Sequence, residues 1–231
     1  MHVQGIIDKW KEFVGGGVSE ITKLRIFDFD ETIAHTEAHV GVIEPDGTTF
    51  KLNDQADFDN YIKKEAAKFS DIDVEAPENF DLTVALSDKD YQFDFSDFSK
   101  VINPEENERI VKIIRDLMAA NEEDKHREIY VMTARRDDAI KAIQKYLKEL
   151  GFSRGDFAGV IALGGESKKE AIERLIAKHI NEEGVTTIES IHFFDDSKKN
   201  LEDVKQLIGE YPNIEDIRIK QVLPDGIITL E

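Results

Sequence analysis

The chain has 231 residues, of which 40% are hydrophobic and 34% are charged, a balance typical of a folded globular protein and not of a disordered one. This length accommodates one substantial domain, or a core domain that carries an insertion. The absence of cysteine excludes disulfide bonds, thiolate metal sites and cysteine nucleophiles, and a formal net charge of −19 disfavours extended binding to nucleic acid through its phosphates.

Residues 1–20 are expected to form a short amphipathic helix followed by a linker that contains three consecutive glycines. This stretch lacks the long apolar run and the cleavage site of a signal peptide. No apolar run in the sequence approaches the ~20 residues of a membrane span. The expected location is therefore cytoplasmic, with no membrane partner.

The first half of the chain predicts one buried strand and then an insertion. Apolar and β-branched residues predict a strand over 21–29. Residues 39–52 alternate polar and apolar side chains around a Pro-Asp-Gly turn, which predicts a hairpin. Helical spacing of apolar residues follows over 53–70, whereas residues 71–103 are acidic and aromatic without a clear period and are expected to form loops or short strands.

The second half alternates predicted helices and strands. Helices are predicted from Asn103, with Pro104 at the first helical position, and over 137–150, 168–180 and 198–208; strands are predicted over 128–133, 158–163, 187–194 and 214–222, with an edge strand over 227–230. This alternation predicts an α/β fold, a Rossmann-like doubly wound parallel sheet covered by helices. Residues 21–33 and 104–231 form this core, and residues 34–103 form a hairpin and a small cap-like insertion after the first strand.

Reactive side chains follow three of the predicted strands. Asp28 and Asp30 come at the end of the first strand, Thr133 at the end of the second, and Asp195 and Asp196 at the end of a later one. In a parallel sheet, functional sites form at the carboxyl ends of strands near a topological switch point. These side chains are therefore expected to meet, and the buried carboxylates among them need a positive or protic partner.

The predicted helix over 168–180 begins with two lysines. Ser167 and Glu170 have the spacing of a capping box, which places Lys168 and Lys169 in the first helical turn, where the helix macrodipole disfavours cations. A negative group nearby would offset this cost. Either lysine could serve as that partner of the carboxylates; the alternative is a solvated lysine pair.

The carboxylates of Asp28, Asp195 and Asp196 suit a hard divalent cation, in the first place Mg²⁺, which takes a few carboxylates together with water and a substrate phosphate. A receiver domain of two-component signalling also combines such residues around Mg²⁺. Its order along the chain is different, with the acidic pair first and the lysine last. The order here, Asp, Thr, Lys and then the Asp pair, disfavours a receiver domain.

Four motifs in this order resemble the haloacid dehalogenase (HAD) superfamily of phosphatases: DFDET at 28–32, MTAR at 132–135, SKKEAI at 167–172 and FFDDSKKNL at 193–201. The resemblance covers the core from about residue 22 to 222 and leaves 34–103 outside. The sequence is also similar to uncharacterised HAD-like proteins encoded by bacteriophages, which implies a host cytoplasmic location.

The resemblance implies a mechanism. Asp28 would attack phosphorus and become an aspartyl phosphate, and Asp30 would protonate the leaving oxygen and then activate water. Thr133 would donate a hydrogen bond to a phosphoryl oxygen, and Lys168 would hold nucleophile and phosphate together. Mg²⁺ would be held by Asp28, the backbone carbonyl of Asp30, and Asp196.

Further residues are assigned through the same resemblance. Lys168 is favoured over Lys169 as the catalytic amine because the apolar residues that follow it match the family's phase. Asp195 stands where many relatives have Gly, and either supports the ligands or binds the metal through water. Asn200 fits an accessory position beside the metal. Candidate substrate-binding residues are Thr32, Arg135, Lys169 and Asn200, and the alternative for Arg135 is a solvated charge at a helix start.

The sequence therefore predicts a Mg²⁺-dependent phosphohydrolase for phosphomonoesters, acting on a nucleotide or another small phosphorylated substrate, and the resemblance implies that the insertion selects that substrate. One alternative is a phosphatase that acts on the phosphorylated end of a polynucleotide in nucleic-acid repair. Others are phosphotransfer to a second substrate and a non-catalytic binding protein on the same fold.

Overall fold

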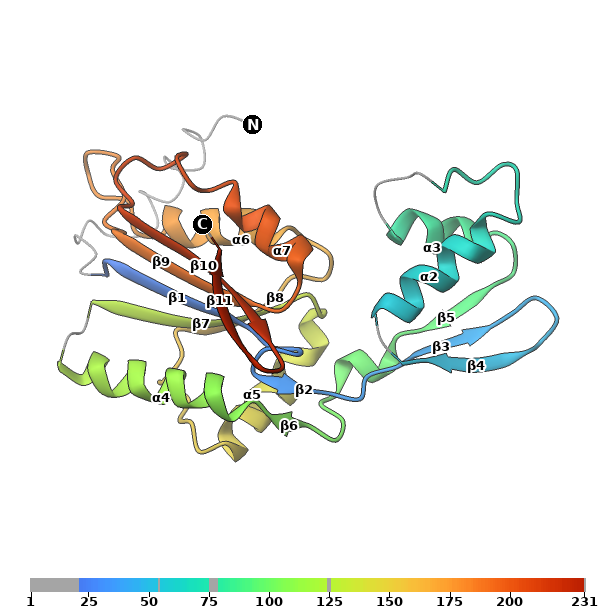
Figure 1. Cartoon of the computed structure of the whole chain (residues 1–231), viewed down its shortest axis with the longest axis horizontal. Coiled ribbons are helices and arrows are strands. Elements are labelled where there is room, and N and C mark those ends of the chain that lie inside the picture. The colour runs from blue at the N-terminus through green and yellow to red at the C-terminus, as the bar shows by residue number, and fades with distance from the viewer. Residues whose placement is uncertain (1–20, 54, 75–78, 124–125, 231) are drawn as a thin grey trace. The chain divides into compact units, whose positions relative to one another are not determined.

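The computed structural model describes residues 21–53, 55–74, 79–123 and 126–230, so the predicted N-terminal helix and glycine linker lie outside the described residues. The chain divides into two compact units (Figure 1). The sheet unit comprises Met1–His35 and Glu105–Glu231, and the inserted unit comprises Thr36–Pro104. None of the helices in the described ranges is both long and apolar enough to cross a membrane.

The sheet unit is built on a six-stranded sheet with the strand order β11-β10-β9-β1-β7-β8. Its strands are β1 (Lys23–Asp28), β7 (Arg127–Thr133), β8 (Gly159–Ala162), β9 (Ser190–Asp195), β10 (Asp216–Leu223) and β11 (Gly226–Leu230). All neighbouring pairs are parallel except β10 and β11. The predicted mostly parallel α/β sheet is confirmed, and the edge strand predicted over 227–230 is the antiparallel one.

Helices cover both faces of this sheet. They are α4 (Glu108–Glu123), the 3₁₀ turn η2 (Asp137–Ala139), α5 (Ile140–Glu149), α6 (Lys168–Ala177) and α7 (Lys198–Lys205). Figure 1 shows α6 and α7 on one face and α4 and α5 on the other. Because β1 lies between β9 and β7 and is covered on both sides, its side chains form a continuous buried run, with Leu24, Ile26 and Phe27 fully enclosed.

The start of α6 follows its sequence signature. The Oγ of Ser167 accepts a hydrogen bond from the backbone N–H of Glu170 at 3.2 Å, as the capping spacing predicts. The start predicted for α4 is wrong, because the helix begins at Glu108 and not at Asn103. The intervening chain pairs instead as the short strand β6 (Glu105–Glu106) with β2 (Ala34–His35), a long-range contact that local helical signals do not reveal.

The inserted unit has a hydrophobic core of its own. It contains β3 (Val40–Ile43), β4 (Thr49–Leu52), α2 (Gln55–Ala66), α3 (Asn79–Ser87), β5 (Gln92–Asp94) and the 3₁₀ turn η1 (Ser96–Ser99). The predicted hairpin is confirmed by the antiparallel pairing of β3 and β4, and α2 falls within the predicted helix. Buried side chains from both helices and from the small sheet make up the core: Val40, Phe58, Ile62, Ala66, Leu82, Leu86 and Tyr91.

Helix α3 lies in the stretch for which loops or short strands were predicted, and that prediction is wrong there. Leu82 and Leu86 lie one helical turn apart and are buried, whereas Val84 between them is 47% exposed. An exposed valine among few apolar positions hides the helical period in the sequence. The aromatic residues of this stretch also contribute to packing, since Phe93 and Phe95 both meet the ring of Phe58 edge-on.

Candidate active site

Three adjacent strands deliver the candidate residues to one edge of the sheet. Asp28 is the last residue of β1, Thr133 the last of β7 and Asp195 the last of β9. The parallel registers align Asp28 with Met132, and Phe27 with Phe194. The carboxyl ends of the three strands therefore lie side by side, where parallel sheets place their sites.

Lys168 supplies the positive partner of the buried carboxylates. Its ammonium group donates hydrogen bonds to Oδ1 of Asp28 and, at 2.5 Å, to Oδ2 of Asp195. The side chains of Lys168, Asp28 and Asp195 are only 2%, 7% and 0% exposed. One cation thus serves two carboxylates, and these contacts offset the unfavourable position of a lysine in the first turn of α6.

The enclosure of this cluster determines its ionisation. Burial would lower the pKa of Lys168, but the charges of Asp28 and Asp195 outweigh that effect and raise its pKa above the ordinary value. For Asp28, burial raises the pKa well above its ordinary value; Lys168 opposes this, and the negative charges of Asp195 and Asp30 add to it. Asp28 therefore lies where additional positive charge is favourable.

The two lysines at the start of α6 lie in different surroundings. The ammonium group of Lys169 lies 3.1 Å from Glu210 and 3.4 Å from Glu173. The structure brings Lys168 to the carboxylates of the sheet edge and places Lys169 in ion pairs with glutamates of the surface. The assignment of Lys168 as the amine of the site is the one this geometry favours.

Arg135 binds Asp30 through two parallel hydrogen bonds. Its Nε lies 2.8 Å from Oδ2 of Asp30, and its Nη2 lies 2.6 Å from Oδ1. The Oγ1 of Thr133 lies 3.4 Å from Oδ2 of the same carboxylate. Arg135 is 4% exposed, so the alternative of a solvated charge at a helix start is wrong.

Asp195 is held by the residues that follow it. Asn200 donates from Nδ2 to both carboxylate oxygens of Asp195, at 3.1 and 3.2 Å, and the backbone N–H of Ser197 donates to Oδ1 at 2.9 Å. Asn200, a candidate for substrate and metal contact, thus supports a buried carboxylate.

Asp196 lies beside this group and is partly exposed. Burial, followed by the charge of Asp195, raises the pKa of Asp196 to about 6. Its backbone carbonyl accepts a hydrogen bond from Nε2 of Gln221 at 3.4 Å, which links the site to β10.

A tight turn directly follows Asp30. The backbone N–H groups of Ile33 and Ala34 both donate to the carbonyl of Phe29, at 2.9 and 3.1 Å, and Glu31 adopts a φ of +56°. Thr32 in this turn is fully buried, and its Oγ1 has no hydrogen-bond partner among the described residues. The structure therefore encloses the hydroxyl of Thr32, which the sequence placed among the substrate contacts.

Asp203 is a site residue that the sequence did not indicate. Its Oδ2 accepts hydrogen bonds from Oγ of Ser167 at 2.8 Å and from the backbone N–H of Lys169 at 3.1 Å. Asp203 lies on α7 and ties down the first turn of α6, in which Lys168 stands. No spacing rule connects it with Ser167, which is 36 residues away; only the packing of the two helices does.

The carboxylates of the sheet edge have the donor chemistry of a Mg²⁺ site. This ion takes hard oxygen ligands from one or two carboxylates, completed by water and substrate. Asp28 and Asp196 offer two such carboxylates, and burial, together with the charge of Asp195, raises the pKa of both. Within the described ranges, no group of three or more His, Asp or Glu side chains is arranged to hold a metal ion. Asp28 and Asp195 are turned to Lys168, and Asp30 to Arg135.

The sequence matches no protein-family model and no curated protein. Among solved structures, the chain is similar to the effector Ceg4 of Legionella pneumophila, with 15% sequence identity, a TM-score of 0.42, and coverage of 92% of this chain and 90% of that chain.

Proposed function

We propose that the protein is a Mg²⁺-dependent phosphohydrolase of the HAD type, which cleaves phosphomonoesters through an aspartyl-phosphate intermediate. The observation that carries the proposal is the enclosed group of Lys168, Asp28 and Asp195 at the carboxyl edge of the sheet, with Asp30 two residues beyond the nucleophile. The strand order with β1 at the centre supports a Rossmann-like doubly wound core.

Asp28 is the proposed nucleophile. Its carboxylate oxygen forms a bond to phosphorus while the bond from phosphorus to the ester oxygen breaks, and the leaving oxygen takes a proton from Asp30. Water then attacks the aspartyl phosphate, gives its proton to Asp30 and releases inorganic phosphate. Lys168 offsets the repulsion between the carboxylate and the phosphoryl oxygens, because its ammonium group already lies on Asp28.

Asp28, Asp196 and the backbone carbonyl of Asp30 would hold the Mg²⁺ ion, which when bound supplies positive charge beside the phosphoryl oxygens. Thr133 would donate a hydrogen bond to one of these oxygens from the end of β7. The inserted unit, Thr36–Pro104, would select the substrate.

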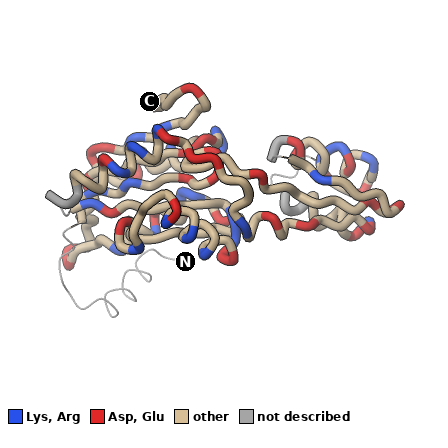
Figure 2. Tube along the Cα trace, turned by 90° about the horizontal axis from the view of Figure 1, so that it is seen from below, with Lys and Arg blue, Asp and Glu red and all other residues tan. Residues whose placement is uncertain are grey.

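A nucleotide or another small phosphate ester is the proposed substrate class. Acidic residues recur along the trace of both units (Figure 2), and the net charge of −19 repels an extended polyanion more strongly than a small ester. Phosphate transfer to water is preferred here to transfer to a second substrate because water needs no further binding site.

The test is release of inorganic phosphate from p-nitrophenyl phosphate and a panel of nucleotides, with Mg²⁺ and with EDTA. The Asp28→Asn variant is expected to lose all turnover, whereas Asp137→Asn, an exposed residue of η2, serves as the matched control and keeps it. If the wild type releases no phosphate from this panel or from 3′- or 5′-phosphorylated oligonucleotides, the proposal is overturned in favour of a binding protein.

A further inference from the structure

We propose that Arg135 is a positioning residue that orients Asp30 for proton transfer, and does not itself bind the phosphoryl group. This inference rests on the proposed function, in which Asp30 exchanges a proton with the leaving oxygen and then with water. It replaces the assignment of Arg135 as a substrate contact. Three features of the structure carry it.

The first feature is the form of the contact. Nε and Nη2 of Arg135 each meet a different oxygen of the Asp30 carboxylate, at 2.8 and 2.6 Å. Two parallel bonds between planar groups fix the plane of the carboxylate as well as its position, which a single bond or a point charge cannot do. The arginine takes up one lone pair on each oxygen, so the other lone pair can carry the proton that Asp30 gives to the leaving oxygen and later takes from water. That transfer needs hydrogen-bond distance and a defined direction.

The second feature is that Arg135 is itself held. Its backbone N–H donates to Oγ1 of Thr133 at 3.2 Å, and its carbonyl accepts from the backbone N–H of Gly164 at 2.9 Å. Its guanidinium lies 5.8 Å from the centre of the Phe29 ring, and that ring meets Tyr146 edge-on. The side chain of Arg135 is thus fixed by the end of β7 and by buried aromatic packing.

The third feature is the difference in exposure within the pair. The side chain of Arg135 is 2% exposed, whereas that of Asp30 is 33% exposed. A substrate that arrives from solvent can therefore reach the carboxylate of Asp30 more readily than the guanidinium of Arg135. Asp30 directly precedes the tight turn that contains Glu31 with its positive φ, and Arg135 reaches it from the end of β7, 105 residues away.

The test compares two substrates that differ in their need for a proton. The nitrophenolate of p-nitrophenyl phosphate leaves without protonation, whereas the alkoxide of glycerol 2-phosphate needs a proton as the bond breaks. We expect Arg135→Lys and Arg135→Met to lower kcat/KM for glycerol 2-phosphate by roughly 100-fold or more and to leave kcat/KM for p-nitrophenyl phosphate within about tenfold, with little change in KM. Arg136→Met, a change at the exposed neighbour, is the matched control and should affect neither substrate.

Asp30→Asn provides the second arm. This variant should lose kcat/KM with the same dependence on the leaving group. The double variant Arg135→Met with Asp30→Asn should have a kcat/KM no lower than that of Asp30→Asn alone, because the effects of residues that act through one another are non-additive. Thermal unfolding checks that each variant is folded. If Arg135→Met is unfolded, Arg135→Lys carries the test, since lysine keeps the charge but cannot form the two-pronged contact.

Equal losses on both substrates, a raised KM and additivity with Asp30→Asn would mean that Arg135 binds the phosphoryl group, and would overturn this inference while leaving the proposed function intact. A wild-type protein that turns over neither of these two substrates, nor the nucleotide panel, nor the phosphorylated oligonucleotides would overturn the proposed function, and this inference with it. Arg135 is supported as the positioning residue if its variants lose kcat/KM selectively for glycerol 2-phosphate and if this loss is not additive with that of Asp30→Asn.

Discussion

The ammonium group of Lys168 lies 2.5 Å from Oδ2 of Asp195, and the two side chains are 2% and 0% exposed. The same ammonium contacts Asp28 on the neighbouring strand. Loss of a partner from an ion pair this deep leaves a charge in a low-dielectric interior, which costs far more than loss of a surface pair. Lys168 thus connects the stability of the sheet edge with its proposed chemistry.

Lys168→Met is expected to abolish phosphate release and to lower the free energy of unfolding by roughly 3–5 kcal/mol, because Asp28 and Asp195 lose their cation. Lys169→Met is the matched control one residue away. It breaks only ion pairs with Glu173 and Glu210 and should cost about 1 kcal/mol or less. Urea unfolding and phosphate release measure both, and similar behaviour of the two variants would refute the separation of the lysines.

Asp203→Ala is expected to loosen the first turn of α6, because the hydroxyl of Ser167 and the backbone N–H of Lys169 lose their acceptor. The free energy of unfolding should fall by about 1–3 kcal/mol, and kcat should fall as Lys168 becomes less fixed. Glu202→Ala, an exposed neighbour on α7, should change neither quantity. Unchanged hydrogen exchange at the start of α6 in the Asp203 variant would contradict this account.

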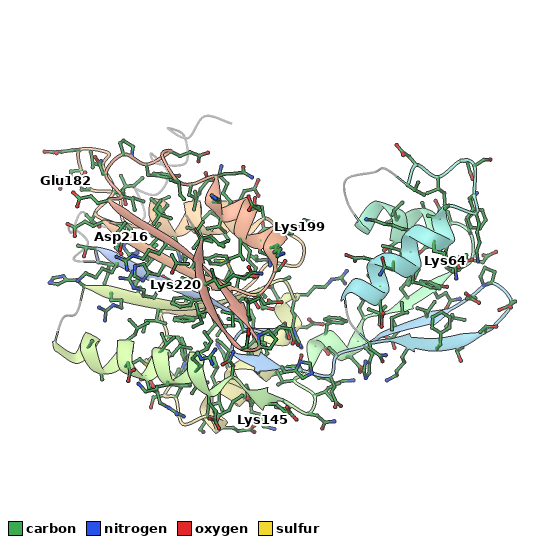
Figure 3. The ribbon with its side chains drawn as sticks, viewed as in Figure 1. Lys64, Lys145, Glu182, Lys199, Asp216 and Lys220 are labelled. Atoms are coloured by element: carbon green, nitrogen blue, oxygen red, sulfur yellow. The ribbon has the colours of Figure 1, made fainter. Side chains whose placement is uncertain are left out.

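His192 is expected to make stability depend on pH. It lies 3.0 Å from Asp216, which Figure 3 labels on β10 together with Lys220. Burial lowers the pKa of His192 from 6.5 to about 4, and the charges of Arg25 and Lys220 act in the same direction. The hydrogen bond with Asp216 opposes this shift only in part. In the unfolded chain this histidine is protonated below about 6.5, so between pH 6.5 and 4 the unfolded state binds more protons than the native state.

Stability should therefore fall as the pH drops through this window, by on the order of 3 kcal/mol from this one group. Urea unfolding at a series of pH values measures the slope, and His192→Gln should flatten it. In the native state His192 and Arg218 lower the pKa of Asp216 to about 2, in spite of burial. The stability that Asp216 contributes is therefore lost only at lower pH. An identical slope in the variant would show that other groups control acid stability.

Magnesium is expected to stabilise the protein, and more so at pH 7 than at pH 5. The pKa of Asp196 is raised to about 6, and a metal ligand must be deprotonated. Binding of Mg²⁺ to the native state alone stabilises that state by RT ln(1 + c/Kd), where c is the Mg²⁺ concentration, so the melting temperature rises with the Mg²⁺ concentration. Asp196→Asn should weaken the apparent Mg²⁺ affinity by about tenfold or more, with Asp137→Asn as control; EDTA should remove the stabilisation. A Mg²⁺ effect independent of pH would count against Asp196 as a ligand.

The parallel sheet could be predicted because its signals are local. Apolar runs such as that of β1 and helices of regular period identify the elements, and the rule that sites form at strand ends predicts that Asp28, Thr133 and Asp195 meet. The cap of α6 at Ser167 is equally local. The elements and the cap depend on neighbours within a few residues of one another, and the meeting of the strand ends follows from the parallel arrangement of the strands.

The features that could not be predicted from the sequence depend on contacts between residues that are distant along the chain. The pairing of Arg135 with Asp30 joins residues 105 positions apart, and nothing in the MTAR motif shows whether its arginine faces solvent or a carboxylate. Asp203 escaped notice because its partners lie on another helix. Helix α3 was missed because Leu82 and Leu86 provide too short a pattern by themselves, and its burial comes from packing against the rest of the inserted unit.

Removal of the inserted unit is expected to leave the sheet unit folded. His35 and Glu105 are ladder partners in the β2–β6 pair, so an Asn-Gly turn in place of residues 36–104 would close a two-residue hairpin. Circular dichroism and thermal unfolding should show a single cooperative transition with helix and strand content retained. An aggregated or non-cooperative product would mean that the sheet unit needs the inserted residues in order to fold.

The β2–β6 ladder also explains how so large an interruption is tolerated in the middle of a sheet protein. The chain leaves and re-enters the sheet unit through adjacent, hydrogen-bonded residues, and the entropy of closing a loop grows only with the logarithm of its length. A segment with its own core brings its ends together by folding. The inserted unit is thus joined where two residue pairs already lie side by side, and a different folded segment with closely spaced ends could take its place at the same junction.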